Sequence, residues 1–417
     1  PRRQVRRHGA RSPVPRARRR AFFEVDLDDE LNGAADGFGD DELLTVVEKM
    51  REEGERRQEH AKSSGHRPAL ELETIEALFA PRGGGGPDMN GLFVDGTFGR
   101  GGHSRSILSR LGDGGRLVAF DVDHAAVAVA RELEKEDPRF RLLHRPFGDL
   151  AEALGGERVQ SILLDVGVSN AQADTFRARG HRGEAMPDTE ALDLRMNRKQ
   201  GVPASEWLQS VSVQELSWVL HTYGERANPL IAERAAEAVL ATQAERGPYA
   251  SAEELAVALR KGIGFQRYSS AFPEKVFLNA IRMFLNSELD QLRKALRGAM
   301  DVLVPGGCCV VLTFKGQERE VVCQVASELE DPPYEAFSRL SSERLCELYP
   351  LVATDLDYAA RLGPLFMRAR PSERAENPRV ASASIIELHK VARRSPRVEA
   401  AARPRGLGER LRRPPPV

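Results

Sequence analysis

Short apolar runs and helix-forming stretches alternate through the middle of the chain. The apolar runs predict four strands, at Leu92–Asp95, Arg116–Phe120, Phe140–His144 and Val159–Leu164. Good helix formers lie between them, and they predict helices at Ser104–Leu111 and Ala125–Glu136. Strands that alternate with helices are typical of a parallel sheet with crossover helices, so the fold class expected is α/β.

The pattern changes between about Thr175 and Asp290, where strand-like runs disappear. Helices are predicted there at Ala204–Tyr223, Leu230–Arg246, Ala252–Lys261 and Val276–Met300. Trp207 and Trp218 lie within these stretches and are expected in the core. A strand at 307–314 follows the turn Pro305-Gly-Gly307. We therefore expect a core at 65–174 and 291–390, interrupted by a helical insertion at 175–290.

Charge is strongly segregated at both ends, although the net charge of the 417 residues is only -1. Residues 1–20 carry nine arginines and no acid, and nine acids lie between Glu24 and Glu42. The stretch from Val391 carries eight arginines against two acids. Blocks of like charge are typical of disordered, solvated tails. We expect a disordered extension at 1–60 and a basic disordered tail at 391–417.

Cysteine spacing argues against a disulfide-stabilised protein, and hydropathy argues against a membrane-spanning one. The four cysteines form no CxxC pair and no zinc spacing, which fits a reduced compartment without a disulfide framework. The longest apolar stretch, Val302–Phe314, contains a proline and two glycines. A membrane span needs about 20 apolar residues, so no membrane association is expected.

A glycine-rich turn and three strand-end acids carry the candidate chemistry. The turn Asp95-Gly-Thr-Phe-Gly-Arg-Gly-Gly-His103 follows the first strand, and Asp121 follows the second. Glycines let the backbone approach a ligand closely, and an acid in the place of Asp121 accepts hydrogen bonds from ribose hydroxyls. NAD and S-adenosylmethionine both fit. The turn is not GxGxxG, which disfavours a pyrophosphate, and Asp95 and Asp165 could face the charged part of a sulfonium cofactor.

At this point the sequence resembles the bacterial MraW-type (RsmH-type) small-subunit, or 16S, rRNA cytosine-N4 methyltransferases, which have organellar relatives. The similar segments keep the family's order along the chain: His66–Leu70, Val94–Ser104, Asp121–Asp123, Pro146–Phe147, Leu163–Ser169, Leu192–Met196, Thr222–Arg226, Ile281–Leu289, Pro305–Gly307 and Asn377–Arg379. The resemblance implies a Rossmann-like class I S-adenosylmethionine-dependent methyltransferase core whose helical insertion recognises substrate.

The resemblance also implies a site and a partner. The residues implied to hold S-adenosylmethionine are Gly101, Gly102, His103, Asp121, Phe147, Asp165 and Gln172. We expect His103 to pack the cofactor loop rather than to bind a metal, and no metal is expected in the site. The partner implied is small-subunit rRNA or the assembled small ribosomal subunit, and a homodimer is left open.

The reaction implied is N4-methylation of a cytidine. The amine of cytosine is a poor nucleophile because its lone pair is shared with the ring, so alignment and acceptance of the amine protons are the main tasks. The candidate catalytic residues are Asp165, Asn170 and Asp193, and a helix cap or a salt bridge to Arg195 is an alternative role for Asp193. Asp331-Pro-Pro-Tyr334 spells a motif of other amino-methyltransferases, but it follows a helical stretch and is predicted to be a turn.

Three segments depart from the family pattern and keep other functions open. They are Arg179–Ala185, Phe272–Ala280 and Thr313–Arg319, which we interpret as substrate-facing. A catalytically impaired, cofactor-binding ribosome-assembly factor is therefore an alternative, as is a methyltransferase with another substrate. The Arg-rich N-terminal stretch resembles a transit peptide, which predicts a mitochondrion or plastid for a eukaryotic chain and the cytoplasm for a bacterial one.

Overall fold

The computed structural model describes residues 68–82, 85–166, 192–197, 200–224, 228–264, 273–363, 367–368, 380 and 382–398. All of them belong to one unit, His66–Val417. The extension predicted at 1–60 lies outside the described residues, as do the candidate residues Asn170 and Gln172.

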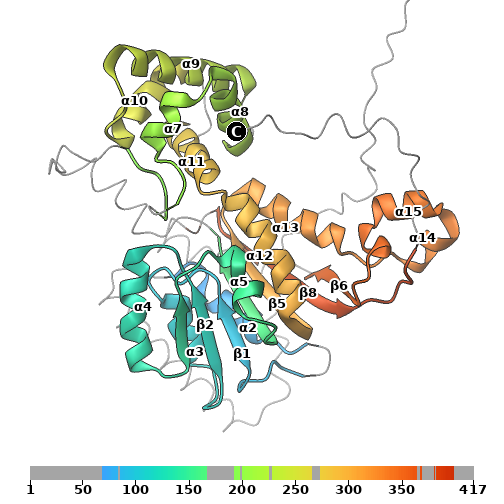
Figure 1. Cartoon of the computed structure of the whole chain (residues 1–417). Helices are drawn as coiled ribbons and strands as arrows, with labels where there is room; N and C mark the ends of the chain where they lie inside the picture. Colours follow the sequence, from blue (N-terminus) through green and yellow to red (C-terminus); the bar gives the residue numbers. More distant parts are fainter. Residues whose placement is uncertain are drawn as a thin grey trace, which may run out of the picture. The chain divides into compact units, whose positions relative to one another are not determined.

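The strands form one mixed sheet in the order β3-β2-β1-β4-β5-β8-β6, with β7 paired to β8 (Figure 1). Their bounds are β1 (Leu92–Asp95), β2 (Arg116–Phe120), β3 (Phe140–Leu143), β4 (Val159–Asp165), β5 (Leu303–Thr313), β6 (Tyr358–Leu362), β7 (Met367–Arg368) and β8 (Ser384–Ala392). Strands β1 to β5 pair in parallel, whereas β8 runs antiparallel to β5 and β6. The predicted α/β class with a parallel sheet is confirmed.

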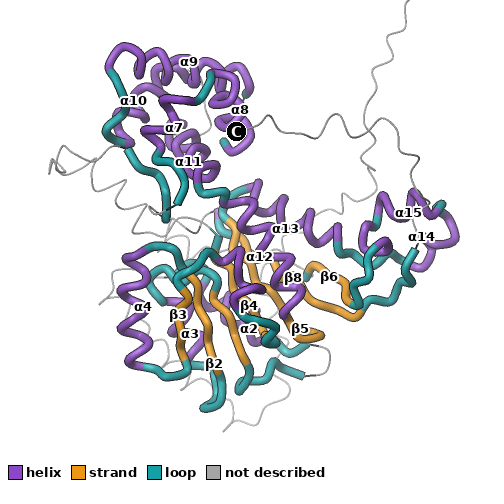
Figure 2. The backbone as a smooth tube through the Cα atoms, viewed as in Figure 1, coloured by secondary structure: helices purple, strands orange, loops and turns teal. Residues whose placement is uncertain are grey.

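Helices cover both faces of this sheet (Figure 2). One face packs against α2 (Glu71–Phe79), α3 (Gly102–Leu108) and α4 (His124–Glu136). The other packs against α5 (Leu150–Ala153), α12 (Glu288–Val302) and α13 (Gly316–Glu328). In β1, Phe93 faces the first layer while Leu92 and Val94 face the second, so the strand is buried on both sides. This explains why it is continuously apolar.

The insertion is a group of helices with a hydrophobic core of its own. Its members are α7 (Ala204–Ser210), α8 (Val213–Tyr223), α9 (Pro229–Arg246), α10 (Ala252–Ile263) and α11 (Pro273–Leu285). The single helix predicted at 204–223 is wrong, because Ser212 starts α8 through a capping box with Glu215. The helix predicted at 276–300 also divides, at Ser287, whose φ of 49° is left-handed.

A small satellite of helices follows α13. It contains α14 (Tyr334–Arg339), α15 (Ser342–Leu348) and the 3-10 turn η4 (Pro350–Ala353). Residues 331–333 of the Asp331–Tyr334 motif connect α13 to α14 without regular structure, and Tyr334 is the first residue of α14, so the motif ends no strand of the sheet. The predicted tail boundary at 391 needs correction, because β8 continues to Ala392 and Arg393 donates hydrogen bonds to the carbonyls of Thr354 and Leu356.

In the described part of the chain, no helix combines the length and the apolar character needed to cross a bilayer.

Candidate functional site

The site lies where the order of the sheet reverses between β1 and β4. Ligands of open α/β sheets bind outside the carboxyl ends of the strands at such a point. Asp95 ends β1 and Asp165 ends β4. The Gly96 amide donates to the Leu163 carbonyl at 2.8 Å, and the Asp165 amide donates to Thr97 Oγ1 at 2.8 Å. These two bonds join the strand ends, so both acids belong to one edge.

The glycine turn connects β1 to α3 and requires two of its glycines. Gly101 precedes α3 with a φ of 79°, and a Cβ on it would lie 2.7 Å from the Phe98 ring. A Cβ on Gly102 would lie 2.3 Å from Pro68 Cγ. Phe98 itself is buried, and its amide donates to the Phe120 carbonyl at 3.0 Å. The turn is therefore packed tightly against Pro68 and β2, where a side chain at either glycine would clash.

Asp95 is fully buried beneath this turn. Its Oδ1 accepts from the Thr97 amide at 3.0 Å, and its Oδ2 accepts from Ser104 Oγ at 2.6 Å. Burial raises the pKa of the Asp95 carboxyl, against the lowering effect of these bonds and of His103. The roles of Thr97 and Ser104 in holding the two acids were not predicted from the sequence, because a hydroxyl in a turn has no distinctive spacing.

His103 connects Asp165 to the start of the domain. Its Nε2 lies 3.1 Å from the Ala69 carbonyl oxygen, and its Nδ1 lies 3.6 Å from Asp165 Oδ2. Asp165 keeps 27% of its side-chain surface, yet the protein packed around it raises its pKa to about 6 through burial, with His103 lowering it and Asp95 raising it. Within the described residues, no Lys or Arg forms an ion pair with Asp95 or Asp165.

Two carboxyl groups at one edge, without a cationic side chain paired to them among the described residues, favour a cationic ligand. A positive charge there would lower both raised pKa values and stabilise the ionised acids. The sulfonium and amino groups of S-adenosylmethionine match this requirement, so the residues present fit that cofactor.

Asp121 follows β2 and holds the outer side of the turn. Its Oδ2 accepts from the Gly99 amide at 2.8 Å, and its Oδ1 accepts from the Asp123 amide at 2.9 Å. A carboxylate has about four acceptor positions, which leaves capacity for ribose hydroxyls. Phe147 follows β3, and its Cβ would lie 3.3 Å from a Cβ on Gly96. The described candidates for cofactor binding therefore meet at one edge of the sheet.

Asp193 forms a salt bridge with Arg195, which is one of the alternative roles that we predicted for it. Arg195 Nη2 lies 2.8 Å from Asp193 Oδ2, and Arg195 Nε lies 3.0 Å from Asp193 Oδ1. The Met196 amide donates to Asn286 Oδ1 at 2.7 Å. These contacts fasten segment 192–197 to the end of α11.

The departing segments at 272–280 and 313–319, which we interpreted as substrate-facing, contain both buried and exposed side chains. Phe277 is buried in the core of the insertion, and Glu274 pairs with Arg260 at 2.8 Å. Gln317 Nε2 donates to the Tyr223 carbonyl at 3.2 Å, and Glu318 is fully buried. These four side chains are therefore internal, whereas Lys275 is exposed and Arg319 is partly exposed, so the substrate-facing interpretation stays a prediction. The segment at 179–185 lies outside the described residues.

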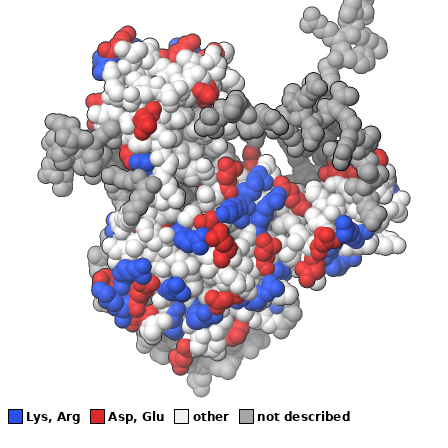
Figure 3. Space-filling model, viewed as in Figure 1, with Lys and Arg blue, Asp and Glu red and all other residues white. Residues whose placement is uncertain are grey.

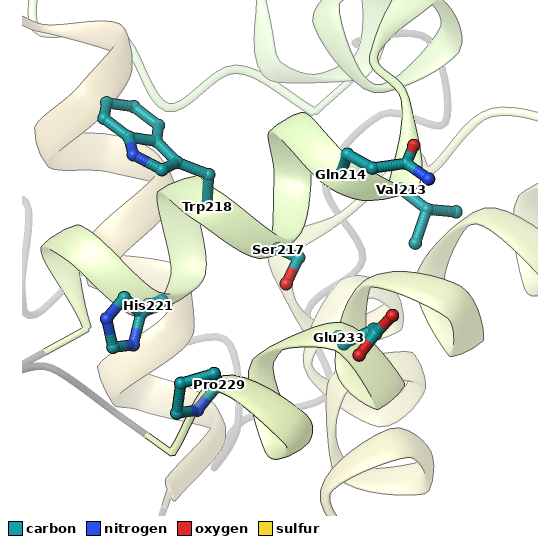
Figure 4. A pocket seen from close by; sticks show the side chains of 7 residues that line it. All are labelled: Val213, Gln214, Ser217, Trp218, His221, Pro229 and Glu233. Carbon is teal, nitrogen blue, oxygen red and sulfur yellow. The ribbon is translucent and has the colours of Figure 1, made fainter. Parts of the chain in front are cut away.

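A separate hollow of about 310 Å³ lies between α8 and the start of α9. Figure 4 shows the side chains that line it: Val213, Gln214, Ser217, Trp218, His221, Pro229 and Glu233. Trp218 is 54% exposed, so its predicted place in the core is wrong, whereas Trp207 packs against the core of the insertion. The Trp218 ring makes T-shaped contacts with Tyr223 and Phe284, with ring centroids 6.0 and 6.3 Å away.

A doubly wound sheet, a glycine turn at its switch point and an acid after β2 define a Rossmann-like protein that binds a nucleoside cofactor. The sequence model of the MraW methylase family matches residues 63–390 of this chain. The chain belongs to this family, which confirms the resemblance, the methyltransferase class and S-adenosylmethionine as the cofactor.

Named relatives cover most of the chain. It is 36% identical over 338 residues to "Ribosomal RNA small subunit methyltransferase H" of Bordetella pertussis, covering 75% of this chain and 90% of that protein. It is 36% identical over 332 residues to the protein of the same name from Coxiella burnetii, covering 78% and 99%. Among solved structures, an rRNA methylase from Streptococcus thermophilus matches with a TM-score of 0.30 and 9% identity, covering 77% and 93%.

Proposed function

We propose that this protein methylates the N4 amine of a cytidine in small-subunit ribosomal RNA, with S-adenosylmethionine as the methyl donor. The observation that carries the proposal is the carboxyl edge of the sheet, where Asp95, Asp121 and Asp165 surround a tightly packed glycine turn. The two relatives are named as methyltransferases of small-subunit ribosomal RNA, which supports RNA of this class as the substrate.

The cofactor is proposed to lie against Gly101, Gly102, His103, Asp121, Phe147, Asp165 and Gln172. When bound, it supplies an electrophilic methyl carbon on a positively charged sulfur. Asp121 accepts hydrogen bonds from ribose, and Asp165 holds negative charge at the switch point above about pH 6. His103 keeps Asp165 in place from the side of Ala69.

The chain's own task in the reaction is to align the amine and to accept its protons. Asp165 is proposed to contribute from the end of β4, and Asn170 from the loop after it. Asp193 is proposed to act indirectly, since both of its oxygens already accept from Arg195. It would then keep segment 192–197 attached to α11 beside Asn286.

Trp218 is proposed to be a contact for an unpaired base of the RNA. Sequence-specific proteins stack unpaired bases on aromatic rings, and the exposed Trp218 ring is held by its edge contacts with Tyr223 and Phe284. The face in Figure 3 shows acidic and basic side chains next to one another. Arg297 of α12 pairs with Glu328 of α13, and Lys294 of α12 pairs with Asp149. Because these basic side chains already pair with acids, the exposed Trp218 ring is the better candidate for contact with RNA.

The decisive experiment is methyl transfer to defined substrates. The full chain is incubated with isotopically labelled S-adenosylmethionine and either naked small-subunit rRNA or assembled small subunits, and the nucleosides are identified by mass spectrometry. We expect labelled N4-methylcytidine. Label in another nucleoside, in DNA or in protein would refute the proposed target.

The same assay addresses the catalytically impaired alternative. Saturable cofactor binding without transfer to any RNA would favour an assembly factor over an enzyme. Phe277 and Gln317 are buried, so these two differences from the family pattern lie in internal contacts, which argues against that alternative.

Targeting by residues 1–60 is a separate proposal. A reporter fused to this stretch is expected in a mitochondrion or plastid, and a diffuse cytosolic signal would contradict it. A homodimer would appear as a doubled mass in sedimentation of the full chain.

A further inference from the structure

Three side chains with metal-binding atoms meet on one face of the sheet, away from the candidate active site. Cys308 in β5 lies directly opposite His389 in β8. Glu387 lies two residues before His389, and alternate residues of a strand face the same side. Their separation of about 80 residues along the chain hid this group from any reading of cysteine spacing.

The donor atoms of the three residues converge. His389 Nε2 lies 3.1 Å from Glu387 Oε2, and Cys308 Sγ lies 3.9 Å from the same oxygen. All three donor atoms lie within 4.8 Å of one another. Gly363 lies against them, since a Cβ on it would be 3.3 Å from His389 Nε2. The group is enclosed, with Cys308 fully buried and His389 8% exposed.

This donor set suits zinc. Zinc takes thiolate, imidazole and carboxylate ligands at about 2.0–2.3 Å, which puts tetrahedral ligand atoms roughly 3.3–3.6 Å apart. The two separations that involve Glu387 Oε2 lie on either side of that range, and the third pair of donor atoms lies within 4.8 Å, so side-chain shifts of up to about 1 Å would complete the geometry. Magnesium and calcium prefer oxygen ligands, so a thiol and an imidazole disfavour them.

Arg82 is the cation already beside this group. Its Nη2 lies 3.7 Å from Glu387 Oε2, and its side chain also donates to the carbonyls of Leu78 and Ala77. These carbonyls hold the guanidinium at the end of α2, so Glu387 can turn toward an ion while Arg82 stays anchored. A thiolate and a carboxylate together neutralise a divalent ion.

We propose that Cys308, Glu387 and His389 form a structural zinc site that ties β8 to β5. On binding, the Cys308 thiol gives its proton to solvent and the sulfur bonds to the metal, with water completing the coordination. Along β5, Cys308 of the proposed zinc site lies four residues from Leu312, which pairs with Asp165 of the candidate active site. At about 3.3 Å per residue they lie roughly 13 Å apart along the strands, which gives the ion no part in methyl transfer.

The test uses cobalt as a spectroscopic substitute for zinc in the full chain, after treatment with a chelator. We expect one thiolate-to-cobalt charge-transfer band that saturates at one ion per chain and is displaced by zinc. Cys308→Ser should remove the band and weaken zinc binding by roughly 10–100-fold or more. Cys309→Ser is the matched control, because Cys309 is equally buried but packs on the opposite face of the sheet.

Other outcomes would overturn the site. They are the absence of a thiolate band in the wild type, and a band that survives Cys308→Ser but disappears with Cys323→Ser or Cys346→Ser, whose thiols are partly exposed. If Cys308→Ser fails to fold, the cobalt affinities of His389→Gln and Glu387→Gln test the site instead. Weaker cobalt binding is expected in both, and unchanged affinity in both would refute the proposal. Zinc should also raise the Tm of the wild type and of Cys309→Ser, and not that of His389→Gln.

Discussion

Glu318 provides the most quantitative prediction, because it is an acid buried without full hydrogen bonding. Its Oε2 accepts from the Phe314 amide at 2.7 Å and from the Lys315 amide at 2.9 Å, which fixes the turn between β5 and α13. Its Oε1 is buried and has no hydrogen-bond partner among the residues that the structure describes. Burial raises the pKa of Glu318 to about 7 from the ordinary value of 4.5, although Lys315 lowers it.

The sign of the effect follows from proton linkage. The folded state binds the Glu318 proton more tightly than the unfolded state, so the free energy of unfolding falls as pH rises from about 4.5 to about 7. A difference of about 2.5 pKa units at 1.36 kcal/mol each makes this loss roughly 3 kcal/mol. Glu318→Gln removes the titration and keeps a carbonyl oxygen for the two amides.

The assay is urea unfolding of the wild type and the Gln variant between pH 5 and pH 8. The difference in free energy of unfolding, variant minus wild type, should increase by roughly 2–3 kcal/mol from pH 5 to pH 8. Any pH-independent effect of the substitution adds the same amount at every pH and does not alter this increase. Glu320→Gln, at an exposed position on the same helix, is the control for replacing an acid by its amide. A difference between Glu318→Gln and the wild type that does not change with pH would refute the reasoning.

The remaining predictions concern the glycine turn, the switch point and the insertion. Gly101→Ala should cost about 1–2 kcal/mol of stability from the left-handed backbone alone, and more from contact with Phe98, in thermal or urea unfolding. Affinity for S-adenosylmethionine should rise as pH increases through about 6, because Asp165 ionises and favours a cation; calorimetry of Asp165→Asn should show no such rise. Trp218→Ala should weaken rRNA binding by about 1–3 kcal/mol in a filter assay and leave cofactor affinity unchanged.

The central strands could be predicted because each is buried on both faces, so its sequence is a continuous apolar run. Asp95 and Asp165 were found by the same logic, since each ends such a run at the edge where ligands bind. Strand β8 was missed, although it lies inside the sheet between β5 and β6. Its sequence carries Glu387, His389 and Lys390 among apolar residues, and its partner β5 lies far away in the chain.

Helix boundaries and tertiary neighbours show where prediction from sequence ends. The Ser212–Glu215 capping box was readable as a helix start, but the surrounding helix-forming residues concealed it. The left-handed Ser287 has no such signal, because packing of α11 and α12 selects it. The burial of Glu318 and the exposure of Trp218 depend on which elements meet, and local pattern does not contain that information.

The most direct test of the account is calorimetric titration of S-adenosylmethionine into the wild type, Asp121→Ala and Asp137→Asn. Asp137 lies at the end of α4 and pairs with Arg139, so its variant controls for loss of an acid elsewhere in the domain. We predict saturable binding at one site, weakened by roughly 10–100-fold in Asp121→Ala through the loss of charge-assisted hydrogen bonds, and preserved in Asp137→Asn. No saturable binding by the wild type, or equal affinity in all three proteins, would contradict the account.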